Sequence, residues 1–175
     1  MNARETSQEP RWLTEEETRA WLGVVSVLMR LPAALDRQLQ RDAGLSHFEY
    51  QVLAGLSMSP ERTMRMSDLA DIADGSLSRL SHTMARLEKR GWVHRFPDPV
   101  DGRYTLARLT EDGWHKVVAS APGHVAAVRE YVIDPLTRTQ IRQLAQIGDR
   151  ITQAIDPDGP CPTQRLTTTP SEPAG

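Results

Sequence analysis

Between residues 76 and 86 the sequence interleaves hydroxyl, imidazole and guanidinium groups with apolar residues. The apolar residues recur at steps of three, four and three, as on the buried face of a helix, at Leu77, Leu80, Met84 and Leu87. The outer faces are then left to Ser76, Ser78, Arg79, Ser81, His82, Thr83 and Arg86. Short hydroxyl groups allow close approach to base edges, and arginines reach guanine O6 and N7 or phosphate oxygens. This surface suits the major groove of DNA, although any solvated amphipathic helix also exposes polar residues.

More cations follow where the hydrophobic pattern no longer has a helical period. Apolar residues flank a turn-rich tip at 97–102 that contains Asp-Gly, which predicts a β-hairpin carrying Arg95, Arg103 and Arg108. Arg103 borders the tip, where it would enter a narrow minor groove beside the major-groove helix. Residues 76–108 hold seven Lys or Arg against three acids, or +4, whereas the whole chain carries −2. The positive charge is therefore concentrated in this segment, which favours a nucleic-acid partner.

The elements that must position these groups are marked by local signals. Capping boxes predict helix starts at Thr14 with Glu17, Ser46 with Glu49, and Thr137 with Gln140. Further starts are expected at Ser67, Ser76 and Thr110, and Gly91 is expected to end the helix that begins at Ser76. Prolines predict a kink near residues 28–32 and an interruption around Pro122-Gly123. The order of short helix, tight turn, polar helix and hairpin is typical of a winged helix-turn-helix.

Several function classes are excluded by composition. The single Cys161 forms no internal disulfide, and the five histidines show no zinc-finger spacing, so no metal or cofactor is expected. The sequence has no glycine-rich phosphate loop, nucleophile elbow or paired catalytic carboxylates, which argues against an enzyme. No apolar run approaches the roughly 18 to 20 residues that span a bilayer, and no signal peptide is visible. We expect a cytoplasmic protein.

Several segments match one known family in the same order over about 50 residues, and this ordered agreement makes the resemblance specific. The sequence is similar to the multiple antibiotic resistance regulator (MarR) family in the segments Arg65–Ala70, Ser76–Ser81, Arg86–Arg95, Asp98–Arg103 and Leu109–Gly113. The resemblance implies a mainly α fold: a winged helix-turn-helix with a two-stranded β-wing and N- and C-terminal dimerisation helices. It also implies a homodimeric, ligand-responsive repressor that binds a pseudo-palindromic operator in double-stranded DNA through the 76–90 helix and the 97–103 wing.

The resemblance also implies which residues contact DNA and how the chain is divided into segments. DNA contacts are expected from Ser76, Ser78, Arg79, Ser81, His82, Thr83, Arg86, Arg95 and Arg103, with Asp101 bracing an arginine, for which Arg86 is a candidate. Leu77 and Gly102 stand where many relatives carry arginines, which bears on affinity. The expected organisation is a flexible N-terminus at 1–13, one domain at 14–155 and a disordered tail at 156–175. Within that domain, 46–109 form the DNA-binding lobe, and 14–42 and 110–155 form the dimerisation helices.

Three alternatives remain at this point. A winged-helix dimer can instead bind and sequester another regulator, in which case binding would lack the steep salt dependence of DNA association. Cys161 invites comparison with thiol sensors, although it lacks a close basic neighbour. A small aromatic or anionic effector is expected to bind near Trp21, Arg30, Arg37, Phe48, Tyr50 and Gln51, although the aromatic residues among them can equally be core.

Overall fold

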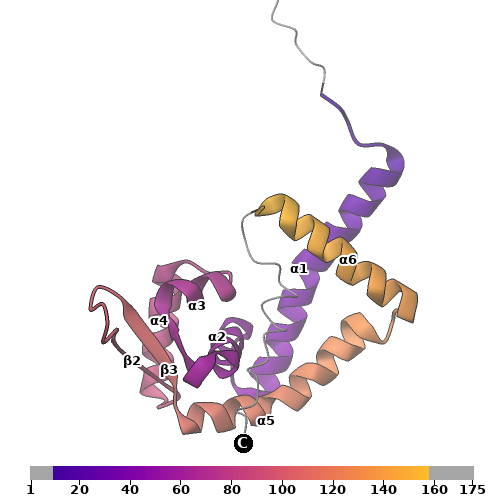
Figure 1. Ribbon diagram of the computed structural model, residues 1–175. Coiled ribbons are helices and arrows are strands. Elements are labelled where there is room, and N and C mark those ends of the chain that lie inside the picture. Colours follow the sequence, from indigo (N-terminus) through magenta and orange to yellow (C-terminus); the bar gives the residue numbers. More distant parts are fainter. Residues whose placement is uncertain (1–9, 158–175) are drawn as a thin grey trace, which may run out of the picture. The chain divides into compact units, whose positions relative to one another are not determined.

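The computed structural model describes residues 10–157, which divide after Ala34 into two compact units (Figure 1). The boundary falls inside the first helix, so it coincides with none of the limits expected from the sequence, and the division into a lobe and dimerisation helices remains a prediction. In chain order the elements are α1 (Glu15–Ala43), α2 (His47–Met58), β1 (Thr63–Arg65), α3 (Met66–Ile72), α4 (Leu77–Lys89), β2 (Val93–Pro97), β3 (Thr105–Leu109), α5 (Glu111–Val128) and α6 (Arg138–Ile155). A 3-10 turn (Pro60–Arg62) precedes β1, and a π-helical turn (Arg129–Ile133) follows α5.

Side-chain caps begin most of the helices where the sequence places them. At α2, the Ser46 hydroxyl accepts from the Glu49 amide at 3.1 Å, and Glu49 Oε2 accepts from the Ser46 amide at 2.9 Å. The boxes of α1 and α6 close in the same way, and single caps begin α4 and α5. The structure therefore confirms these caps. They could be predicted from the sequence because each depends only on residues three positions apart.

Two helix predictions are wrong. Ser67 does not cap α3, which begins at Met66 without a side-chain cap, because the Ser67 hydroxyl bonds Asp68 instead, at 2.9 Å. The helix α5 continues through Pro122 and Gly123, and the regular pattern changes only at the π-helical turn that follows. A proline removes one backbone hydrogen bond and need not end a helix whose neighbours hold it. The kink predicted at residues 28–32 remains a prediction, since Pro32 lies inside the continuous α1.

The hairpin is confirmed, and it belongs to a three-stranded antiparallel sheet of order β1-β3-β2 (Figure 1). Val93 pairs with Leu109 at one end and Pro97 with Thr105 at the other. The strand β1 adds three residues to the far edge of β3. The sequence missed β1 because three residues are too few to show an alternating pattern.

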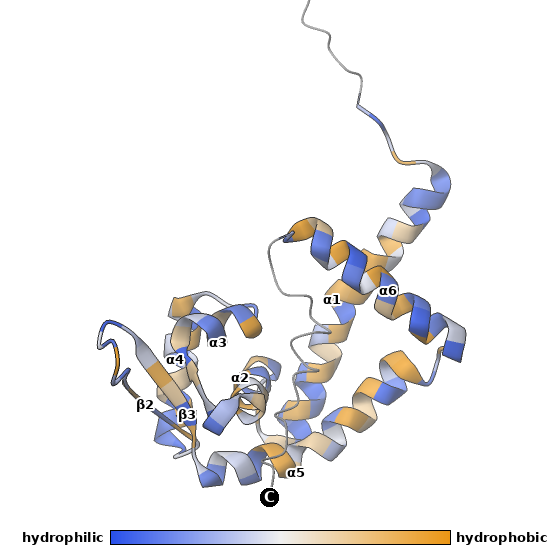
Figure 2. Ribbon diagram, viewed as in Figure 1, coloured by the Kyte–Doolittle hydropathy of each residue, from blue (hydrophilic) through white to orange (hydrophobic). Residues whose placement is uncertain are grey.

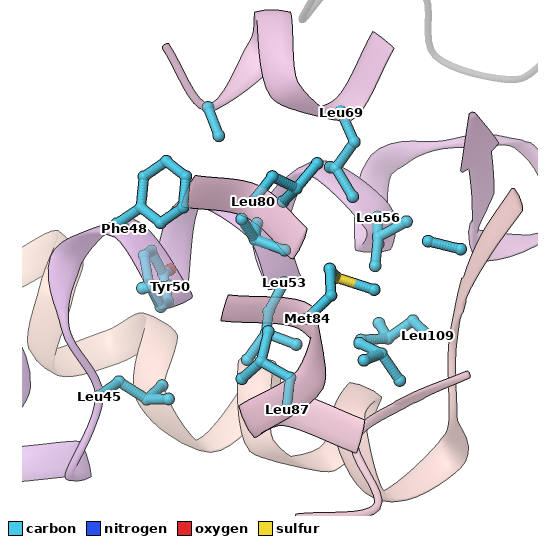
Figure 3. Packing of buried hydrophobic residues seen from close by; sticks show 14 of the residues in the cluster. Leu45, Phe48, Tyr50, Leu53, Leu56, Leu69, Leu80, Met84, Leu87 and Leu109 are labelled. Atoms are coloured by element: carbon cyan, nitrogen blue, oxygen red, sulfur yellow. The ribbon is translucent and has the colours of Figure 1, made fainter. Parts of the chain in front are cut away.

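The core lies where α2, α3 and α4 pack with the inner face of the sheet (Figure 3). Leu80, Met84 and Leu87 are fully buried, as their spacing predicts. Leu77 is 57% exposed, which contradicts the prediction that it belongs to the buried face. It shares the helical face of Leu80, so its exposure means that the first turn of α4 extends beyond the core.

Apolar residues recur along the first and last helices (Figure 2), and many of their side chains are exposed. The helix α6 buries no residue, and its Leu144, Ile147, Ile151 and Ile155 all face solvent in the single chain. On α1, Trp21, Leu22, Val27, Leu28 and Met29 are each more than half exposed. By length and composition α1 is also apolar enough to cross a membrane, which contradicts the expectation that no segment has this property. A terminal helix whose apolar face is covered by another chain can have the same length and composition.

Candidate nucleic-acid interface

The outer face of α4 combines small hydroxyl groups with one imidazole and one guanidinium. Ser78, Arg79, Ser81 and His82 are all exposed, as the sequence predicts. Ser76 is also exposed, but its hydroxyl is occupied as the N-cap, where it accepts from the Arg79 amide at 3.2 Å. The start of α4 therefore presents the N-terminal end of a helix together with two serines and a cation, a set suited to phosphate oxygens and base edges.

Arg79 is held by an aromatic ring. Its guanidinium carbon lies 4.0 Å from the centroid of the Phe48 ring, in cation–π geometry. Within residues 10–157 no carboxylate forms an ion pair with it. Arg79 thus keeps its full charge on the surface of α4.

Thr83 does not lie on the outer face of α4, where the sequence predicts it, and its contact with DNA remains a prediction. Its side chain is only 2% exposed. At about 100° per residue Thr83 lies only about 40° around the helix from Leu87, on the flank of the buried face. Its hydroxyl oxygen accepts a hydrogen bond from Arg86 Nη2 at 3.3 Å, and this contact helps to hold the Arg86 side chain in place.

Arg86 pairs with a buried acid, which the sequence did not anticipate. Its Nε donates to Glu49 Oε1 at 3.3 Å, and Glu49 is 7% exposed. The expectation that Asp101 braces an arginine is confirmed, but its partner is Arg103 and not the candidate Arg86. Glu49 and Arg86 are 37 residues apart, and no local spacing relates them.

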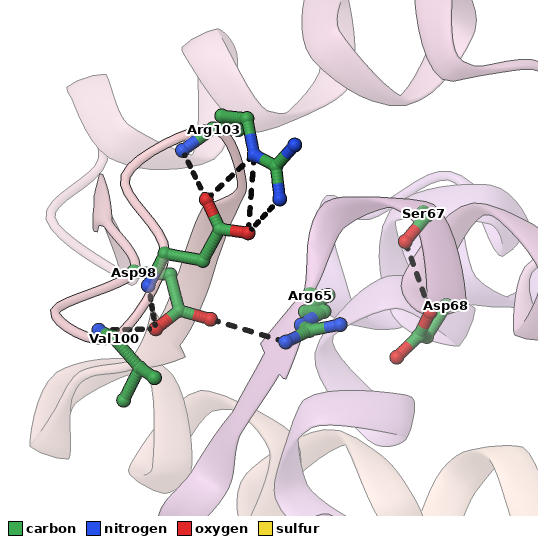
Figure 4. A network of polar contacts seen from close by, with 7 residues as sticks. Arg65, Ser67, Asp68, Asp98, Val100 and Arg103 are labelled. Atoms are coloured by element: carbon green, nitrogen blue, oxygen red, sulfur yellow. Dashed lines mark hydrogen bonds and ion pairs between the residues drawn. The ribbon is translucent and has the colours of Figure 1, made fainter.

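Asp101 instead binds Arg103, two residues along the wing (Figure 4). The shortest contact joins Arg103 Nη2 to Asp101 Oδ2 at 2.6 Å, and the arginine side chain remains 84% exposed. The hydrogen bonds from Arg103 lower the pKa of Asp101, and the same pairing raises the pKa of Arg103. The guanidinium is thus oriented at the tip of the wing while its outer edge stays in water.

Asp98 organises the base of this tip (Figure 4). It accepts from the backbone amides of Val100 at 2.9 Å and Asp101 at 3.4 Å, and it pairs with Arg65 of β1 at 3.4 Å. The Val100 hydrogen bond is the main reason that the pKa of Asp98 is lowered. Sequence reasoning missed both Asp98 and Arg65, although an Asp beside proline in a turn is a signal for such backbone hydrogen bonds.

Arg95 is not free to reach DNA as expected. Its Nη2 lies 2.6 Å from Glu88 Oε2, its backbone amide donates to Glu88 Oε1, and the arginine side chain is 27% exposed. These hydrogen bonds lower the pKa of Glu88. Arg95 therefore ties β2 to α4, and its charge is largely neutralised.

The six residues proposed for an effector site lie in both units of the chain. Trp21 and Arg30 belong to the first unit, and the other four to the second. Phe48 and Tyr50 are buried at 6% and 9% exposure, so their expected role as open pocket walls is not seen. Phe48 covers Arg79, and Tyr50 packs 4.5 Å from the His124 ring. The effector site remains a prediction.

Three of the five histidines illustrate two different environments, one exposed and one partly buried. His82 is exposed on α4, whereas His47 and His124 face each other with ring centroids 6.0 Å apart. Burial lowers the pKa of both His47 and His124. Within residues 10–157 no group of three or more potential ligand side chains could hold a metal ion. Cys161 lies outside the described residues.

Comparison with known proteins places this arrangement in a family. The model of the MarR family matches residues 45–105. Sco3205, a MarR family transcriptional regulator from Streptomyces coelicolor solved in complex with DNA, is 46% identical with a TM-score of 0.81, over 86% of this chain and 94% of that one. AbsC, a second MarR family regulator from Streptomyces coelicolor, is 37% identical with a TM-score of 0.79, over 85% of this chain and all of that one.

Curated relatives match a shorter segment. The HTH-type transcriptional regulator YdcH of Bacillus subtilis is 30% identical over 80 residues, 45% of this chain. The chain spans 54% and 61% of the lengths of the two curated relatives it matches. The fold, the wing and the extended similarity to solved regulators agree, and the chain belongs to the MarR family, whose members are transcription regulators and not enzymes.

Proposed function

We propose that the protein is a homodimeric regulator that binds double-stranded DNA through the first turn of α4 and the tip of the wing. The observation that carries the proposal is the exposed face of α4, where Arg79, which pairs with no carboxylate among the described residues, accompanies Ser78, Ser81 and His82. The wing adds Arg103, exposed and oriented by Asp101. The DNA complex of a relative 46% identical to this chain supports the assignment.

A second copy of the chain completes the regulator. The exposed apolar residues of α1 and α6 supply faces that a partner would cover. Two copies related by a two-fold axis would read half-sites about one helical turn apart, roughly 34 to 36 Å, in a pseudo-palindromic operator. Repression, response to a small aromatic or anionic effector, and action in the cytoplasm are part of the same proposal and rest on the family.

Selection of duplexes from a random pool, followed by affinity measurements, tests the proposal. The selected duplex should bind with a log–log salt slope that reports several released counterions. Arg79→Ala should cost about 1 to 3 kcal/mol and relax preference at one base pair. Arg103→Ala should weaken binding and lessen the dependence on A·T content beside the half-site.

Arg138→Ala is the matched control, since it removes an exposed arginine at the start of α6, outside the proposed surface. It should leave affinity unchanged. No selected duplex, or equal affinities and salt slopes in all three variants, would overturn the DNA-binding surface and favour a protein-binding adaptor instead.

A further inference from the structure

Two arginines of α4 rest on adjacent residues in the first turn of α2. Arg79 lies over the ring of Phe48, and Arg86 bonds the carboxylate of Glu49. The two arginines are seven residues apart, close to two helical turns, and so lie on one side of α4. The beginning of α2 therefore contacts both arginines of the helix that is proposed to read DNA.

The two contacts differ in what they do to charge. Glu49 is buried, and both of its oxygens are used: Oε2 accepts from the Ser46 amide at 2.9 Å, and Oε1 accepts from Arg86 at 3.3 Å. The pair neutralises Arg86 and ties the cap of α2 to α4. An aromatic ring attracts a guanidinium through its quadrupole but carries no net charge. Phe48 can therefore orient Arg79 and leave its positive charge for a ligand.

The ring itself has little freedom. Phe48 is 6% exposed and lies among the core side chains near Leu80 (Figure 3). A Cβ added to Gly75 would stand 2.7 Å from both Cε2 and Cζ of the ring. Glycine at this position thus lets the turn before α4 close against Phe48, while the guanidinium lies over the ring. A ring fixed in this way holds Arg79 in one orientation before any DNA arrives, which reduces the entropy that the side chain loses on binding.

We propose that Phe48 is a positioning residue for DNA recognition, which orients Arg79 without neutralising it and is itself held by the close approach of Gly75. The inference rests on the proposed function, because it requires that Arg79 contact DNA. It adds a residue in the core of α2, away from the exposed face of α4, that sets both the affinity and the base preference of that face.

The test is a double-mutant cycle on the selected duplex, with Phe48→Leu, Arg79→Ala and the combined variant. Phe48→Leu should weaken binding about 3- to 10-fold and relax preference at the base pair that Arg79→Ala affects. In the Arg79→Ala background it should have no further effect on affinity, since the side chain that Phe48 positions is gone. Urea unfolding of the same proteins should show the same stability loss from Phe48→Leu in both backgrounds.

Two further variants separate the cation–π contact from packing. Replacing Phe48 with 2,6-difluorophenylalanine keeps the ring and weakens its negative face without adding atoms at Cε2 or Cζ, the ring atoms nearest Gly75, so it should lower affinity while the fold is retained even if Phe48→Leu unfolds. Phe96→Leu is the matched control, because it removes a ring on β2 that lies 5.2 Å from the Arg108 guanidinium and that the proposal does not use.

The outcomes are distinguishable. If Arg79→Ala weakens binding but the fluorinated ring does not, the inference is wrong and the proposed function stands. An equal loss of affinity from Phe48→Leu with and without Arg79 would show that Phe48 acts only through the core, and would also overturn the inference. If Arg79→Ala leaves affinity and base preference unchanged, the assignment of Arg79 to DNA fails, and the role of Phe48 fails with it.

Discussion

Similar apolar residues are buried in the lobe formed by α2 to β3 and exposed on the terminal helix α6. In the lobe Leu53, Leu56, Leu80 and Leu87 have no exposed surface at all. In α6 Leu144, Ile147 and Ile151 are 43% to 51% exposed, although their spacing of three and four places them on one helical face just as clearly. Hydrophobic periodicity thus indicates that a face will be covered, but not whether the same chain covers it. The apolar face of the lobe is buried within one chain, whereas the apolar face of α6 is exposed in the single chain.

The largest effect that tests this comparison should come from charge on the open face of α6. Ile147→Asp with Ile151→Asp places four carboxylates in a two-fold interface, because each substitution occurs in both copies. We expect a loss of about 5 kcal/mol or more of dimerisation free energy and a shift to monomer in sedimentation equilibrium.

Gln146→Asp with Gln153→Asp is the control, since it adds the same charge to exposed polar positions of α6. It should leave the dimer intact. A double isoleucine variant that sediments as the wild type does would show that α6 is not covered by a second copy, and the comparison would need another explanation.

A smaller effect is expected where the lobe meets the start of α5. A Cβ on Gly113 would stand 2.1 Å from the Trp92 carbonyl oxygen and 2.7 Å from Leu109 Cδ1. A backbone carbonyl cannot move aside without shifting the sheet, so Gly113→Ala should lower the free energy of unfolding by about 3 kcal/mol in urea titrations.

Gly148 of α6 provides the matched substitution, because within residues 10–157 no heavy atom beyond its sequence neighbours and its own helix backbone lies within 4 Å of an added Cβ. In the background of Ile147→Asp with Ile151→Asp, where no second copy covers α6, Gly148→Ala should raise stability by about 0.5 to 1 kcal/mol through helix propensity. A loss at Gly148 as large as the loss at Gly113 would contradict the view that α6 is open within one chain.

The comparison also explains which features the sequence could predict. Helix caps, the wing and the buried face of α2 depend on residues a few positions apart, and the structure agrees with these predictions except for the cap expected at Ser67. Thr83 was misplaced because it lies at the border between two faces of α4, where composition does not decide burial. The partners of Arg86 and Arg79 could not be found from spacing, because Glu49 and Phe48 meet α4 only through tertiary packing. The exposed face of α4 was therefore predictable, whereas the contacts that hold its arginines were not.

The smallest effect concerns the contact between α2 and α5, where the lobe meets the helix that leads to α6. His47 and His124 face each other beside Tyr50, and burial lowers the pKa of both histidines, opposed at His47 by Asp36. A histidine with a lowered pKa in the folded state favours folding when neutral. Its contribution is thus present above its unfolded pKa, about 6.5, and is lost as the pH falls through the folded value.

Because both rings are partly exposed, we expect the free energy of unfolding to fall by less than about 1 kcal/mol between pH 7.5 and 5.5. His124→Asn should flatten this dependence in urea titrations, whereas His82→Asn, at an exposed position on α4, should not. An unchanged pH dependence in His124→Asn would mean that this contact does not sense protonation, and that the lobe is joined to α5 by apolar packing alone.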